Sequence, residues 1–238
     1  MSMKILISND DGINSHGIAR LARAAKNFGE VWVVAPNKQK SGSSHSINLH
    51  TPVAVKEEKF KVKGVRAFSV KGSPADCVRI GILNLLPEKP DFVLSGINFG
   101  VNAGTDVMYS GTIGAAMEAR FQEIPAAAIS EGTNIAAANT DEHILEILEE
   151  VFNTPLQYNE IVNVNFPDCK PQDCRGVLRD RFVSHSQVYK DSYTADKLTE
   201  KITTYMVQGT RGQTYEPGSD LQALRDNYIS IGMVRNMY

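Results

Sequence analysis

Hydrophobic residues in the first 167 positions of the chain form short uninterrupted runs, separated by stretches with helical spacing. Ile5–Ile7 is such a run, and apolar residues at helical spacing follow it from Ile18 to Phe28. Runs without alternation are typical of strands buried on both faces of a parallel sheet. Strands that alternate with helices through right-handed crossovers predict a doubly wound α/β fold. The further runs are Val31–Val34, Phe92–Leu94, Ile124–Ile129 and Ile161–Val164.

Local signals predict where several of these helices begin and end. Gly29 is a natural stop for the first helix, because glycine readily adopts the backbone conformation found just after helices. Ser73-Pro74-Ala75-Asp76 has the form of a capping box with proline at the first helical position, which predicts a helix that ends before Pro87. Thr140 is predicted to cap a helix whose apolar stripe runs over 144–151.

The pattern changes after about Pro167. Arg181–Tyr193 and Thr203–Val207 are polar, aromatic and β-branched without a helical stripe, which predicts extended, hairpin-like segments. Exposed strand edges favour pairing between chains. We therefore expect a single domain over 1–238, with an α/β core at about 1–167 and a β-rich appendage at about 168–238 that serves oligomer contacts.

The charge balance favours a small phosphorylated ligand. The chain has 238 residues, with 25 Lys and Arg against 27 Asp and Glu, and a net charge of -2. This leaves no basic field for a nucleic-acid polymer, whereas one phosphate group needs only a local site. No run approaches the ~18 continuous apolar residues of a membrane span. We expect a cytoplasmic protein with reduced cysteines and no membrane contacts.

The strongest local feature is Asn9-Asp10-Asp11-Gly12, which directly follows the first predicted strand. Ligands of open α/β sheets bind outside the carboxyl ends of the strands, which is where this motif falls. Two adjacent carboxylates repel each other unless a cation neutralises them, and gathered oxygen ligands suit Mg²⁺, Mn²⁺ or Ca²⁺. The alternative is that one aspartate caps the following helix while the other faces water.

Three further polar, glycine-rich segments follow, two of them directly after strands. Their glycines let backbone amides approach an anion, and the free N–H groups at a helix start form a phosphate site. Alternatives are a flexible linker for the serine-rich loop, ordinary capping for Ser110 and Thr112, and a surface or packing role for His45. Because the topology brings such segments to one rim of the sheet, we interpret them together as an active site. The segments are Ser41–Ser46, Ser95–Gly100 with Asn102 and Gly104, and Ser110–Thr112.

These positions predict a metal-dependent phosphatase. Asp10 and Asp11 would supply negative oxygens to one divalent metal, and the neutral oxygens of Ser41 and Asn98 would complete its coordination. A bound metal polarises phosphoryl oxygens and lowers the pKa of a bound water, so we expect this water to attack phosphorus directly. The catalytic group is predicted to be Asp10, Asp11 and Asn9. The phosphate is predicted to be held by Ser110, Gly111, Thr112, Asn102, Gly42 and His45.

Three alternative interpretations remain. An aspartyl-phosphate mechanism would use Asp10 or Asp11 as the nucleophile. A receiver-like phosphoacceptor signalling domain needs a third Asp and a Lys at later strand ends, where the chain offers Asn98 and then Ser130 and Glu131. A silent nucleotide-binding module gains little from carboxylates that face a phosphate, because without a metal they would repel it.

Five motifs in order and spacing resemble the survival protein E (SurE) family of 5′/3′-nucleotidases, from near the N-terminus to about Ile231. They are Ile7–Gly12, Ala35-Pro36 with Ser41-Gly42, Gly72–Cys77, Ser95–Asn98 and Ser110–Thr112.

The resemblance implies a Rossmann-like fold and a Mg²⁺- or Mn²⁺-dependent phosphatase that acts on nucleoside 5′- and 3′-monophosphates. It implies metal ligands at Asp10, Asp11, Ser41 and Asn98. It also implies a homodimer or homotetramer with exchanged C-terminal segments, and an exopolyphosphatase activity on short polyphosphate, which some members have. The family usually continues further past the segment that matches Tyr228–Ile231, so the end at Tyr238 leaves dimer and tetramer both open.

Overall fold

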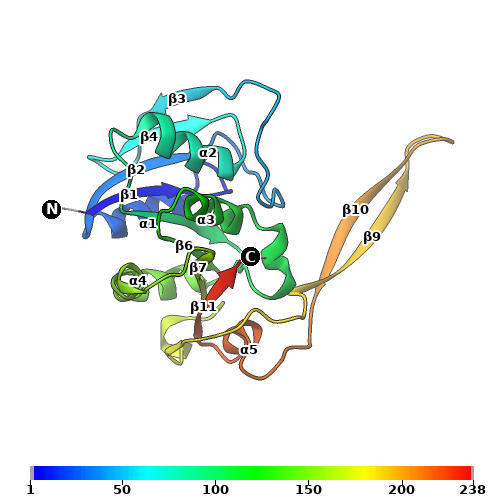
Figure 1. Ribbon diagram of the computed structural model, residues 1–238. Coiled ribbons are helices and arrows are strands. Elements are labelled where there is room, and N and C mark those ends of the chain that lie inside the picture. Colours follow the sequence, from blue (N-terminus) through cyan, green and yellow to red (C-terminus); the bar gives the residue numbers. More distant parts are fainter. Residues whose placement is uncertain (1–2, 237–238) are drawn as a thin grey trace.

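The computed structural model describes residues 3–236 and is built around a nine-stranded sheet (Figure 1). The strand order is β3-β4-β2-β1-β5-β6-β7-β11-β8, and neighbours are parallel except for β3 with β4 and β11 with β7. The predicted doubly wound, mostly parallel fold is therefore confirmed. In this order the strands span Val55–Glu58, Arg66–Val70, Gly29–Pro36, Met3–Ser8, Phe92–Phe99, Ala126–Glu131, Glu160–Phe166, Ile229–Arg235 and Val177–Leu178.

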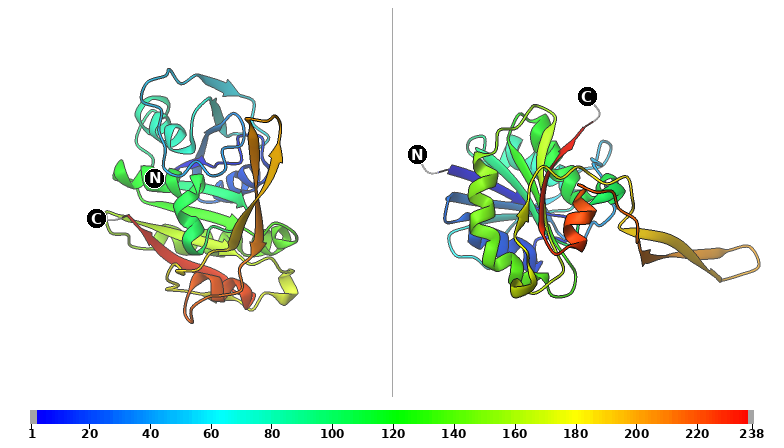
Figure 2. Two further views of the ribbon diagram at one scale, coloured as in Figure 1. Left: turned by 90° about the vertical axis from the view of Figure 1, so that its right-hand side faces the viewer. Right: turned by 90° about the horizontal axis from the view of Figure 1, so that it is seen from below.

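Helices cover both faces of this sheet (Figure 2). One face carries α1 and α4, and the other carries α2, the π-helical turn η1 and α3. The side chains of β1 divide between the two cores, with Ile5 and Ile7 in the first and Leu6 in the second. All three are fully buried, which explains why this run shows no alternation. The helical segments in the order named are His16–Ala25, Ala136–Asn153, Pro74–Ile80, Gly81–Leu85 and Gly111–Phe121.

One predicted helix boundary is confirmed and another is wrong. The capping box is present, because Ser73 Oγ accepts from the Asp76 N–H at 3.0 Å and Asp76 Oδ2 accepts from the Ser73 N–H at 2.9 Å. Gly29, however, does not stop α1, which ends at Ala25. Gly29 begins β2 instead, where an added Cβ atom would lie 1.8 Å from the carbonyl oxygen of Met3. Glycine is required at this position because the backbones of β1 and β2 approach too closely there for a side chain.

The prediction that Thr140 caps α4 is also wrong, because the helix already begins at Ala136. Asp168, in the loop after β7, caps this helix from a distance in the sequence. Its Oδ1 accepts hydrogen bonds from the N–H groups of Asn134 at 3.1 Å and Ile135 at 2.9 Å. Unpaired N–H groups at a helix start need such an acceptor, and a carboxylate also suits the helix dipole.

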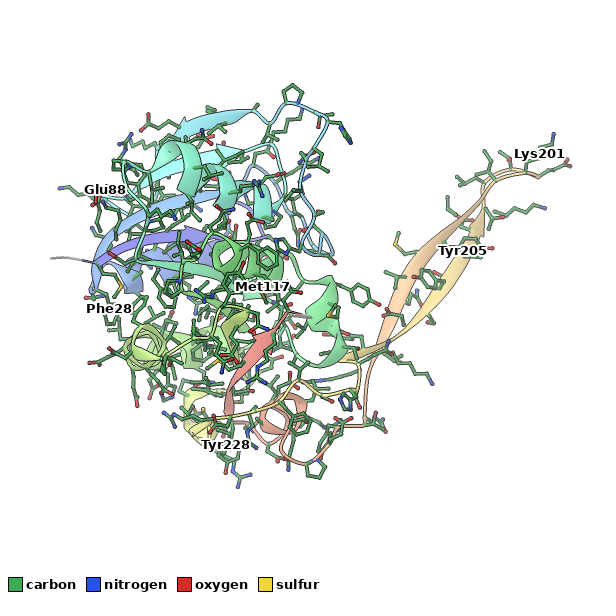
Figure 3. The ribbon with its side chains drawn as sticks, viewed as in Figure 1. Phe28, Glu88, Met117, Lys201, Tyr205 and Tyr228 are labelled. Carbon is green, nitrogen blue, oxygen red and sulfur yellow. The ribbon has the colours of Figure 1, made fainter. Side chains whose placement is uncertain are left out.

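A long hairpin projects from the body of the molecule (Figure 1). It consists of β9 (Tyr189–Lys197) and β10 (Thr203–Arg211), which pair with each other and with no other described strand. Tyr205 lies along the hairpin and Lys201 lies at its tip (Figure 3). Every residue of the two strands is exposed, so the predicted extended appendage is a ribbon without a core of its own.

The chain then returns to the main sheet. The helix α5 (Asp220–Arg225) packs against β11, and β11 pairs with β7. Ile229 is fully buried in the same core as β1, so the sheet extends beyond the predicted boundary near Pro167. Within residues 3–236, no helix is both long and apolar enough to cross a membrane. Two 3₁₀ turns complete the structure, η2 (Gly104–Tyr109) and η3 (Pro171–Asp173).

Candidate functional site

The carboxyl ends of β1 and β5 lie side by side at the centre of the sheet, where Ser8 and Ser95 are register partners. From β1 the chain passes through α1 to β2 on one side, and from β5 it passes through α3 to β6 on the other. Open α/β sheets bind ligands at such a topological switch point. The four predicted metal ligands lie in the segments after β1 and β2 and near the end of β5.

Asp10 lies at this switch point with 3% of its surface exposed. Its Oδ1 accepts a hydrogen bond from the Thr112 hydroxyl at 2.7 Å, so the carboxylate faces the first turn of α3. Burial raises the pKa of Asp10, and the hydroxyl of Thr112 and the N–H groups of Thr112 and Gly111 offset only part of the rise. A buried carboxylate of this kind is stabilised by a nearby cation.

Asp11 is held from another direction. Its Oδ2 accepts a hydrogen bond from the Phe99 N–H at 2.9 Å, at the end of β5. Burial raises the pKa of Asp11 to about 6, and the negative charges of Asp10 and Glu131 add to the rise. A divalent cation would remove the repulsion between two neighbouring acids whose pKa values are both raised, so the pair fits a metal ion.

Neutral oxygens are available beside the aspartates. The Lys40 N–H donates to the carbonyl oxygen of Asp10 at 2.7 Å, which holds the exposed Ser41 close to the acidic motif. Asn98 donates from Nδ2 to the carbonyl of Gly100 at 2.6 Å, so its Oδ1 is the atom suited to a cation. Residues 3–236 contain no group of three His, Cys, Asp or Glu that could hold a metal. A metal at this site therefore depends on neutral ligands, and the four-ligand set stays a prediction.

The structure adds Ser43, a residue that sequence reasoning missed. Its Oγ is buried and has no hydrogen-bond partner among the described residues. A Cβ atom added to Gly111 would lie 2.5 Å from this oxygen and 2.9 Å from Cβ of Asp10, so these residues are closely packed. A buried hydroxyl without a partner costs free energy, so this oxygen is available to a water or a polar ligand at the start of α3. The serine-rich run was the available signal, but it did not tell which hydroxyl turns inward.

The residues of the predicted phosphate-binding turn, Ser110–Thr112, make different contacts. Ser110 Oγ accepts from the Ile113 N–H at 3.1 Å and so caps α3, as the alternative interpretation held. The hydroxyl of Thr112 is committed to Asp10. An anion at this helix start would therefore meet backbone N–H groups and the hydroxyl of Ser43, and the O–H of Ser110, which only accepts in the cap, stays free to donate.

Comparison with known proteins shows which protein family the chain matches. The family described as Survival protein SurE matches residues 5–211 of the chain. The chain belongs to the SurE family. The 5′-nucleotidase SurE of Clostridium beijerinckii is 37% identical over 234 residues, which cover 96% of this chain and 91% of that protein. The 5′-nucleotidase SurE of Alkaliphilus metalliredigens is 38% identical over 237 residues, with coverage of 96% and 91%.

The fold of the SurE family is confirmed by a solved structure. The crystal structure of the SurE protein from Aquifex aeolicus matches with a TM-score of 0.81 and 32% sequence identity. The match covers 98% of this chain and 94% of that chain, so it includes the C-terminal appendage as well as the α/β core.

Two predicted site residues of this SurE-family chain have hydrogen-bond partners elsewhere in the protein. Asn102 donates from Nδ2 to Ser130 Oγ at 2.8 Å, and its N–H donates to Asn165 Oδ1 at 2.7 Å within a buried amide network. His45 Nε2 lies 2.9 Å from Glu118 Oε2, two turns along α3. These contacts engage one N–H of Asn102 Nδ2 and one ring nitrogen of His45, and the phosphate-binding roles of both residues stay predictions.

Asn9 and Gly42 shape the loops of the site. Asn9 Nδ2 donates to the Gly12 carbonyl at 3.1 Å and to Ser15 Oγ at 2.9 Å, and its Oδ1 accepts from the Gly12 N–H at 3.2 Å. Asn9 thus braces the turn that presents the two aspartates. Gly42 has a φ of +71° and open space around an added Cβ atom, so its glycine serves the backbone conformation of the serine-rich loop.

Gly114 of α3 offers a test of how this loop is held. An added Cβ atom would lie 2.3 Å from the carbonyl oxygen of Ser44, where the loop backbone crosses the helix. Alanine favours helices over glycine by up to about 1 kcal/mol, but the clash with backbone costs about 1–3 kcal/mol. We expect Gly114→Ala to lower the free energy of unfolding, measured by urea denaturation. Gly81→Ala is the control, since the atoms nearest its Cβ would be side-chain atoms of Leu6 and Val34, at 3.1 Å or more, and not backbone. Equal losses in both variants would contradict this interpretation.

Proposed function

We propose that the protein is a divalent-metal-dependent 5′-nucleotidase, which hydrolyses nucleoside 5′-monophosphates to nucleoside and phosphate. The observation that carries this proposal is the pair of buried carboxylates at the switch point, Asp10 and Asp11, beside the start of α3. The relatives named 5′-nucleotidase SurE support the same substrate class.

One Mg²⁺ or Mn²⁺ per subunit would be held by oxygen ligands, which both cations prefer. When bound, the metal supplies neutralisation of charge on the phosphoryl oxygens and lowers the pKa of a bound water. The raised pKa values of both aspartates and the absence of a third acidic ligand in residues 3–236 fit a site completed by neutral groups. The proposed ligands are Asp10, Asp11, Ser41 and Asn98.

The residues around the metal site would orient the substrate. The unpaired hydroxyl of Ser43 would donate to the phosphate oxygens at the start of α3, and the N–H groups of Gly111 and Thr112, which face Asp10, would be shared between its carboxylate and the phosphate. The Thr112 hydroxyl fixes the direction of the Asp10 carboxylate. Such prepositioned donors stabilise the negative charge that builds up on phosphorus oxygens during hydrolysis.

We propose direct attack of water on phosphorus without a phosphorylated intermediate. Asp10 and Asp11 each accept a hydrogen bond on one carboxylate oxygen, and a metal bound through the other oxygen would leave neither free to act as a nucleophile. Acid quenching during turnover tests this step. Recovery of an acyl phosphate on either aspartate would overturn direct attack in favour of the aspartyl-phosphate route.

The proposal extends to nucleoside 3′-monophosphates, to short polyphosphate as a side substrate, and to a cytoplasmic homodimer or homotetramer. The exposed hairpin carries Tyr193, Tyr205 and Met206 with two thirds of their surfaces open, at 66%, 67% and 69%, which suits contact with a second copy of the chain. Light scattering that returns the mass of one chain at micromolar concentration would contradict the oligomer.

A phosphate-release assay tests the main proposal. We expect wild-type protein to release phosphate from AMP, GMP, CMP or UMP with added Mg²⁺ or Mn²⁺. Excess EDTA should abolish release, because the attacking water would be activated only by a bound metal. Restoring the metal after EDTA should restore the rate. Absence of release from every monophosphate with either metal would rule out the proposed activity.

A further inference from the structure

A cavity of about 600 Å³ opens beside Asp11, between α1 and α4. Its volume lies within the range of small-molecule sites in proteins. It contacts the proposed metal site directly, because Asp11 forms part of its wall. A smaller cavity of about 220 Å³ at the base of the hairpin contains none of the proposed metal ligands. The residues of the larger cavity used below are Asp11, Arg20, Phe99, Glu131 and Asp141.

The two aspartates connect this cavity to the start of α3. The carboxylate of Asp10 meets Thr112 on the α2/α3 face of the sheet. The carboxylate of Asp11 meets the Phe99 N–H and borders the cavity on the α1/α4 face. A substrate whose phosphate is held at the start of α3 and beside both aspartates therefore has the cavity available for the group that the phosphate esterifies.

The charge of the cavity selects against a second phosphate. Its wall includes three carboxylates, on Asp11, Glu131 and Asp141, against the single guanidinium of Arg20. Arg20 is already paired with Glu131 at 2.6 Å and with Asp141 at 2.8 Å. An uncharged group with hydrogen-bond donors suits this wall, and a nucleoside has such donors on its ribose hydroxyls and, in most cases, its base.

Phe99 supplies a flat apolar surface at the cavity. The residue is 64% exposed, while its backbone N–H donates to Asp11 at 2.9 Å. An exposed aromatic ring next to a polar site is a stacking surface for a planar base. We propose that the cavity between α1 and α4 binds the nucleoside part of the substrate, with the Phe99 ring stacked on the base. This inference rests on the proposed nucleotidase function and names the site that recognises the base.

A pair of substrates that differ only in the base tests this proposal. We expect wild-type protein to have a higher kcat/KM for AMP than for ribose 5-phosphate. Phe99→Ala should raise KM for AMP about 10-fold or more, with kcat/KM for ribose 5-phosphate within about twofold of wild type. Phe99→Trp keeps a stacking ring and should keep the low KM. Equal losses for both substrates would overturn the proposal, since the ring would then serve only the shape of the metal site.

A binding measurement separates this proposal from the catalytic one. Equilibrium dialysis of adenosine with EDTA present needs neither a metal nor turnover. We expect adenosine to bind wild type and Phe99→Trp, and to bind Phe99→Ala at least about 10-fold more weakly. Tyr158→Ala is the matched control. Tyr158 is 63% exposed and directly precedes β7, so it lies at the amino end of that strand, away from the carboxyl ends that carry the site. If adenosine binding depends on the Phe99 ring but no phosphate is released, the nucleoside site is upheld and the nucleotidase proposal fails. If all variants bind adenosine equally, the nucleoside site is overturned.

Discussion

Asp10→Asn is expected to reduce phosphate release by about 10³-fold or more while leaving the protein at least as stable as wild type. The substitution removes a negative charge proposed to bind the metal. It keeps an amide oxygen that can accept the hydrogen bond of Thr112, now 2.7 Å long. Because burial raises the pKa of Asp10, the charged form is disfavoured in the folded protein, and the neutral amide relieves that cost. Enzyme assays and thermal unfolding on the same samples would measure both effects.

Asp220→Asn is the matched control at a second buried aspartate. Asp220 Oδ1 accepts from the N–H groups of Ser184 at 3.0 Å and Leu221 at 2.7 Å, and Oδ2 accepts from the N–H of Gly104 at 2.9 Å. Asparagine has one oxygen and cannot satisfy both sides, so this variant should lose stability and keep phosphate release. If Asp10→Asn keeps more than about a tenth of the wild-type rate, the proposed role of Asp10 is wrong.

Arg20→Met is expected to lower the free energy of unfolding by about 3–5 kcal/mol, which corresponds to roughly 10 °C in Tm for a chain of this length. Arg20 Nη1 lies 2.6 Å from Glu131 Oε1, and the two side chains are 16% and 7% exposed. Burial lowers the pKa of Arg20, but the hydrogen bonds to Glu131 and Asp141 outweigh it and the pKa is raised. Without the guanidinium, Glu131 would keep a buried charge whose Oε2 already has no partner among the described residues.

Two further variants make this expectation specific. Asp141→Asn removes the partner that is 59% exposed and should cost less than about 1 kcal/mol, because exposed pairs contribute little. The double variant Arg20→Met with Glu131→Gln should recover most of the loss, since no buried charge remains. Urea denaturation at one fixed protein concentration would measure all three variants. If Arg20→Met alone stays within about 1 kcal/mol of wild type, the Arg20–Glu131 pair is not an essential contact between α1 and β6.

Local patterns predicted the parts of the fold that depend on neighbours in the sequence. The run Ile5–Ile7 and the capping box at Ser73 produced a strand and a helix as expected. Strands β3 and β4 were not predicted, because Val55–Glu58 is an edge strand with exposed residues and β4 has only five residues. An edge strand carries little hydrophobic pattern, since it borders the core on one side only.

Local sequence patterns predicted less of the candidate site than of the fold. The acidic motif was visible because its residues are adjacent, but the commitments of Asn102 and His45 depend on residues far away in the chain. Asn102 is paired with Asn165, and His45 with Glu118. The unpaired hydroxyl of Ser43 could not be predicted, because several serines are neighbours in this loop and the sequence does not show which side chain faces inward.

The position of β11 in the sheet affects how the protein is made. β11 pairs with the outer edge of β7, yet it follows β7 in the chain and leaves the ribosome later. Roughly 70 residues separate the two, and their synthesis takes roughly 3–14 s at ordinary rates of chain elongation. During that interval β7, whose residues are all buried in the finished protein, has an unpaired hydrophobic edge of the kind that recruits other chains. Nascent chains therefore pass through an interval in which chaperone binding competes with aggregation, and slower translation of the segment between β7 and β11 lengthens it.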